Sequence, residues 1–138
     1  MDNIEDFNRG CALILARLYA AFPVPQVLRM ADLDECLDVP DDLRAARRQQ
    51  RIALYGATMQ FLADEGHVTF ASKAGPGQGE AFSGVRLTAN GLAQLSKTPE
   101  ALRAPGRTLG ERLAESAGKI AEQGAADAIK ALVAAVFS

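Results

Sequence analysis

Residues 43–95 constrain the fold most, because a predicted helix in this stretch feeds directly into a predicted β-hairpin. The helix is expected to end at Gly66. Its apolar residues recur at helical spacing: Ile52, Tyr55, Met59 and Leu62. Two runs of strand character follow, over residues 67–71 and 81–87, and a glycine-rich loop joins them. Thr88 can then cap a short closing helix.

Two positions in this stretch predict local geometry. Gly56 lies inside the helix, where it indicates either close approach to a neighbouring helix or a kink. On the second strand, Phe82 falls out of phase with Val85, which predicts a β-bulge at Ser83-Gly84.

The N-terminal segment is predicted to be a long helix at the centre of the core. Asn3 can cap it, and its apolar residues recur every three or four positions: Ile4, Phe7, Cys11, Ile14, Leu18 and Phe22. Pro23 and Pro25 end this helix, an extended piece follows at 24–30, and a short second helix is expected at 31–37. Together these elements predict an α+β fold that is mostly α.

The C-terminal part is predicted to be one long helix. We expect a main domain over residues 1–99, a linker at 100–108 and a helix over 109–138. The middle of that helix is mostly Ala, Gly and Ser, which bury little area each, so the segment is not expected to be stable alone. It should therefore pack on the first domain, on a second copy or on another protein.

Composition is that of a globular, cytoplasmic protein. Apolar residues make up 49% of the 138 and charged residues 23%, and the longest apolar runs are too short to span a bilayer. The acidic N-terminus is unlike a secretory signal, and we predict no membrane association. Cys11 and Cys36 are isolated, so each is expected to be a free thiol in a reducing compartment.

A set of four arginines leads the helix of residues 43–66. Arg44, Arg47, Arg48 and Arg51 recur at three- and four-residue spacing, so they are expected to share one exposed face, with Gln49 and Gln50 beside them. Arginine can bond guanine edges and glutamine adenine edges, and both can bond phosphate. The net charge of the chain is −2, but residues 41–51 carry four arginines against two acids. This face is therefore expected either to contact DNA or to be a solvated or protein-binding surface.

The glycine-rich loop is predicted to be a flexible hairpin tip. Ser72 and Lys73 precede it and could lie along phosphates. Its glycines lie between two strands rather than between a strand and a helix, which argues against a dinucleotide-binding loop. His67 is the single histidine and lacks partners at metal-ligand spacing, so we predict no metal site, no cofactor and no catalytic activity.

Two phrases carry a resemblance to a known superfamily. Residues 59–68, MQFLADEGHV, contain the pattern L-x-x-E-G, and residues 87–95, LTANGLAQL, contain L-T-x-x-G-L-x-x-L. Over residues 4–98 the chain resembles the winged helix-turn-helix superfamily of bacterial regulators. The resemblance implies a three-helix core with a β-hairpin wing, usually dimeric and usually bound to double-stranded DNA. Carried over by position, it implies these DNA-binding residues: Arg44, Arg47, Arg48, Gln49, Gln50, Arg51, Ser72 and Lys73.

Two functions are consistent with the sequence. The first is a small DNA-binding transcriptional regulator that forms a homodimer through its terminal helices. The alternative is a non-catalytic interaction module, such as an adaptor or a phage- or toxin-associated accessory protein, with a protein partner at the C-terminal helix. Overall acidity and the alanine-rich tail favour this alternative.

Overall fold

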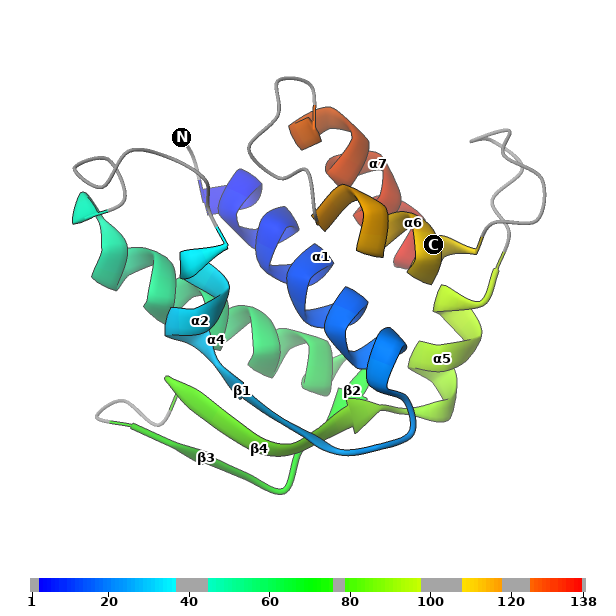
Figure 1. Ribbon diagram of the computed structural model, residues 1–138, viewed down its shortest axis with the longest axis horizontal. Helices are drawn as coiled ribbons and strands as arrows, with labels where there is room; N and C mark the ends of the chain where they lie inside the picture. Colours follow the sequence, from blue (N-terminus) through cyan, green and yellow to red (C-terminus); the bar gives the residue numbers. More distant parts are fainter. Residues whose placement is uncertain (1–2, 37–44, 76–78, 98–107, 118–124, 138) are drawn as a thin grey trace.

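The computed structural model describes residues 3–36, 45–75, 79–97, 108–117 and 125–137, which form an α+β fold that is mostly helical (Figure 1). These residues contain six helices and a four-stranded antiparallel sheet. In chain order the elements are α1 (Asn3–Ala21), β1 (Gln26–Arg29), α2 (Met30–Glu35), α4 (Arg48–Asp64), β2 (Val68–Thr69), β3 (Ser72–Ala74), β4 (Ala81–Leu87), α5 (Ala89–Leu95), α6 (Leu109–Ala117) and α7 (Ala125–Val136).

Helix α1 is the centre of the core, as its apolar periodicity predicts. It lies between α4 on one side and the pair α6 and α7 on the other (Figure 1). Residues 10–16 are buried without interruption, so the helix contacts neighbours on every side through this part. One charged residue, Asp6, is also buried, and Arg9 Nη1 donates to its carboxylate at 2.7 Å. The packing explains why a helix with so few exposed positions is stable in water.

Strand β4 is the middle of the sheet. β1 pairs with one edge of β4, and β2 and β3 pair with the other, so the first strand in the sequence lies beside the last. The predicted strand at 67–71 is thus the shorter β2, followed by β3. Between paired positions, β4 has one residue more than β1, and Gly84 there has a φ of 66°. The bulge predicted at Ser83-Gly84 is confirmed.

Helix α4 lies against the hairpin, by which we mean β3, β4 and the described residues between them: Gly75, Gly79 and Glu80. A Cβ added at Gly56 would lie 2.2 Å from the carbonyl oxygen of Gly79. The close approach predicted at Gly56 is therefore present, but its neighbour is the hairpin and not a second helix. Contact with the backbone of Gly79 fixes how near α4 and the hairpin lie to each other.

The C-terminal region forms two helices, so the prediction of one long helix is wrong. α6 and α7 pack on each other and on α1 (Figure 1). Thr108 and Glu111 form a reciprocal capping box that starts α6. Residues on the inner faces of both helices are buried in the core shared with α1: Leu109, Leu113, Ile129, Leu132, Val133 and Val136. Of the three packing partners that the sequence left open, the first domain of the same chain contacts both helices.

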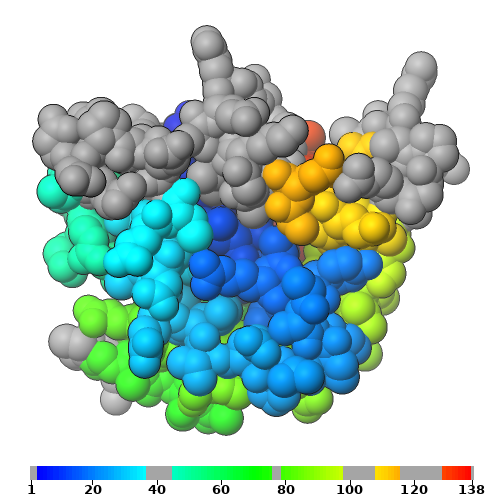
Figure 2. All heavy atoms as spheres, in the orientation of Figure 1, coloured from blue at the N-terminus to red at the C-terminus, as the bar shows by residue number. Residues whose placement is uncertain are grey.

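The start of α4 and the hairpin lie on the same side of the molecule. In Figure 2 the first turns of α4, in teal, and the hairpin, in green, reach the surface at the left edge, while β1 and α2 cover the front. In the described ranges, the helices are too short or too polar for any of them to cross a bilayer.

Candidate nucleic-acid interface

Helix α4 starts at Arg48, later than predicted, because the chain turns at Arg47. Arg47 has a φ of 60°, in the left-handed region that disfavours residues other than glycine. Of the three arginines that the structure describes, Arg47 is exposed and Arg51 is buried, so the prediction that they share one exposed face is wrong. Arg44 lies outside the described residues.

Arg51 forms a buried ion pair with Asp34 of α2. Its Nε and Nη2 donate to the two carboxylate oxygens of Asp34 at 2.5 and 3.1 Å, and its Nη1 donates to the carbonyl of Ala46 at 2.7 Å. Arg51 is 6% exposed and Asp34 is fully buried. The hydrogen bond to Asp34 raises the pKa of Arg51, so its guanidinium stays charged. This pair ties α2 to α4, and the prediction that Arg51 stands on the DNA-facing surface is wrong.

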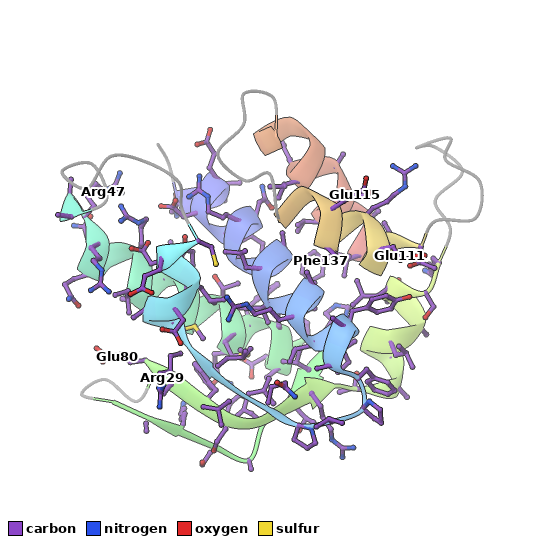
Figure 3. The ribbon with its side chains drawn as sticks, viewed as in Figure 1. Arg29, Arg47, Glu80, Glu111, Glu115 and Phe137 are labelled. Carbon is purple, nitrogen blue, oxygen red and sulfur yellow. The ribbon has the colours of Figure 1, made fainter. Side chains whose placement is uncertain are left out.

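The other predicted residues at the start of α4 remain at the surface. Arg47, Gln49 and Gln50 are exposed, and Arg47 Nε donates to Gln50 Oε1 at 2.9 Å. Arg48 is half-buried, with its Nε 3.8 Å from a carboxylate oxygen of Asp34. The side chain of Arg48 thus lies toward buried Asp34. Arg47, in contrast, projects at the N-terminal end of α4 (Figure 3).

Both predicted hairpin residues lie on exposed β3. Lys73 Nζ reaches across to α4 and donates to Gln60 Oε1 at 3.2 Å. The hydroxyl of Ser72 is hydrogen-bonded to that of Ser83 on β4. The structure therefore brings Lys73 to α4 but occupies the hydroxyl of Ser72 within the sheet.

A groove runs beside the contact between α4 and the hairpin. It consists of two adjoining hollows of about 310 Å³ each, both lined by Gln49, Ile52 and Glu80. Lys73 lines one hollow, and Arg29 and Arg48 line the other. Arg29 was not among the residues predicted from the sequence. Figure 3 shows it near Glu80, so the cations of the groove face one carboxylate.

An aromatic cluster, Phe7, Phe61 and Phe137, lies at the opposite end of α4. The ring centroids are 5.4 to 6.3 Å apart, and Phe61 and Phe137 are 41% and 36% exposed. The ring of buried His67 lies 5.1 Å from Phe137, and its Nδ1 has no hydrogen-bond partner within the described residues. Burial lowers the pKa of His67, so the ring is neutral at pH 7. This cluster was not predicted from the sequence, because its members come from three distant segments.

The described residues offer no group of three or more His, Cys, Asp or Glu side chains that could hold a metal ion. Cys11 and Cys36 are both free thiols, as predicted, and burial raises the pKa of Cys11. Comparisons with protein-family models, curated proteins and solved structures found no match to this chain.

Proposed function

We propose that this protein is a winged-helix transcriptional regulator that binds duplex DNA with α4 as its recognition helix and the hairpin as its wing. The order of elements supports this proposal: α1, β1, α2 and α4 precede the hairpin, and β1 pairs with β4. The observation that carries it is the surface where α4 begins, since Arg47, Gln49 and Gln50 are exposed there beside a hairpin that bears Lys73. A recognition helix presents such N-terminal residues to a major groove. This role would fit a cytoplasmic protein.

The charge of this surface supports modest affinity. Arg29, Arg47, Arg48 and Lys73 can approach phosphates, and Glu80 opposes them. Each neutralised phosphate makes the logarithm of the binding constant fall by about 0.9 for each unit of log salt concentration. A protomer that uses these cations would therefore bind DNA weakly at physiological salt, and two copies would bind more tightly than one.

The double substitution Arg47→Ala and Arg48→Ala is expected to weaken binding to random-sequence duplex DNA by about tenfold at low salt and to make the salt dependence shallower by about two phosphates. Fluorescence anisotropy at several salt concentrations measures both quantities. The matched control is Lys97→Ala with Lys130→Ala. It also removes two positive charges from exposed positions, one just after α5 and one on α7. Equal loss in both variants, or unchanged binding in the first, would contradict the proposal.

The aromatic cluster favours a second candidate function, a protein-interaction module. Phe61 and Phe137 are large exposed apolar side chains that touch each other, and Ile4 on α1 is 57% exposed. Large contiguous apolar patches on a protein surface often mark interaction sites. The inner faces of α6 and α7 are buried within one chain, so a homodimer through the terminal helices needs another surface, and this patch offers one.

If the patch joins two copies, the full chain should sediment as a dimer, and Phe61→Ser should convert it to a monomer without loss of helical content. Analytical ultracentrifugation over a range of protein concentrations measures this change. Val24→Ser is the control, since Val24 is 59% exposed and belongs to the segment between α1 and β1. A wild-type chain that stays monomeric at every concentration would rule out self-association through the patch.

A further inference from the structure

The outward stripe of α4 is uncharged over its first three turns. Gln49, Gln50, Ala53 and Ala57 are all exposed, at helical spacing along one side. The charges on this helix surface lie at its ends, with Arg47 and Arg48 at the start and Asp64 at the finish. A polyanion is therefore attracted to the first half of the stripe and repelled from its last turn.

Burial of Arg51 decides which base edges this stripe can recognise. Arginine is the side chain that most often reads guanine, through O6 and N7. Within the described part of α4, Arg51 is buried against Asp34, and Arg48 is held 3.8 Å from the same carboxylate. Arg51 is thus withdrawn from the surface and Arg48 is partly withdrawn, so the exposed stripe beyond Arg47 consists of the two glutamines and the two alanines.

We infer that α4 recognises A·T base pairs in the major groove, an inference that rests on the DNA binding proposed above. A glutamine amide can accept from adenine N6 and donate to adenine N7 at the same time. The methyl groups of Ala53 and Ala57 can contact the 5-methyl group of thymine, and their small size lets the helix backbone approach the bases closely.

One contact in the structure favours Gln50 in this role. Arg47 Nε donates to Gln50 Oε1 at 2.9 Å, so the amide is held by a neighbour before DNA binds. A side chain that is already oriented loses less conformational entropy on binding. Gln50 is therefore expected to contribute more discrimination than Gln49.

The test compares the full chain on alternating A·T and alternating G·C duplexes of equal length at one salt concentration. We expect the A·T duplex to bind at least about fivefold more tightly. Replacing adenine by 7-deazaadenine, or thymine by uracil, removes the N7 acceptor or the 5-methyl group from the major groove alone. Each replacement should reduce the preference, and the loss of adenine N7 should reduce it more.

The variant Gln49→Ala with Gln50→Ala should lose the preference while keeping salt-dependent binding to both duplexes. Asn90→Ala, an exposed amide on α5, should keep it. Equal binding of the wild type to the two duplexes would overturn the A·T inference and leave DNA binding intact. A preference that survives both modified bases would also overturn it, because minor-groove contacts would then be responsible. Absence of binding to either duplex would overturn the proposed function as well.

Discussion

Replacing Asp34 with alanine is expected to lower the free energy of unfolding by about 3–5 kcal/mol, because the Arg51 guanidinium would stay buried without its partner. The pair is enclosed, with Asp34 fully buried and Arg51 only 6% exposed. Arg48, whose Nε lies 3.8 Å from the same carboxylate, is itself a cation with no acceptor atom, so it cannot replace the lost hydrogen bonds. Because Asp34 lies on α2 and Arg51 on α4, the contact between these helices should loosen first.

Urea denaturation followed by circular dichroism measures this effect. Asp32→Ala is the matched control, since Asp32 is an exposed acid on the same helix and should change stability by less than about 0.5 kcal/mol. The double variant Asp34→Leu with Arg51→Met should recover most of the lost stability, because it removes both buried charges together. If Asp34→Ala were as mild as the control, the ion pair would not hold α2 on α4.

Local sequence signals predicted most of the regular structure. Helix α1 and its two terminal prolines, the strand runs and the bulge at Ser83-Gly84 each depend on residues close together in the chain. The cap at Thr88 is a further example, since its hydroxyl accepts from the amide of Gly91 three residues later. Periodicity and capping are properties of short segments, so a sequence alone can reveal them.

The site was harder to predict because its contacts join distant segments. Arg51 is in helical phase with buried Tyr55 and Leu62, which was a signal that it faces inward. Its charge favoured the opposite interpretation, and the partner that makes burial possible, Asp34, lies 17 residues earlier. The turn at Arg47 had no sequence signal of its own, because left-handed geometry is uncommon for any residue with a side chain.

The division of the C-terminal region into two helices was obscured by composition. Large apolar residues are sparse between Leu113 and Ile129, so periodicity there is too weak to place a break. Glycines at positions 118 and 124 were the available signal for an interruption. The packing of α6 and α7 on α1 could not be inferred from either feature, since three partners were equally compatible with an apolar face.

Leu113→Ala is expected to destabilise the whole protein by about 2–5 kcal/mol, the usual cost of a cavity at a fully buried leucine. Leu113 has no exposed surface and lies on α6, which packs directly on α1 at the centre of the core. The loss should appear as one shifted transition, because α1 also packs against α4 and couples the C-terminal helices to the rest.

Chemical denaturation monitored by tyrosine fluorescence and by circular dichroism tests this coupling, because Tyr19 on α1 and Tyr55 on α4 lie in different parts of the core. Val27→Ala is the control, since Val27 is 62% exposed on β1 and should have a small effect. Two separate transitions, with only the first shifted by Leu113→Ala, would mean that α6 and α7 unfold as an appendage. A single transition shifted in both signals would mean that they stabilise α1, and through α1 the helix that we propose binds DNA.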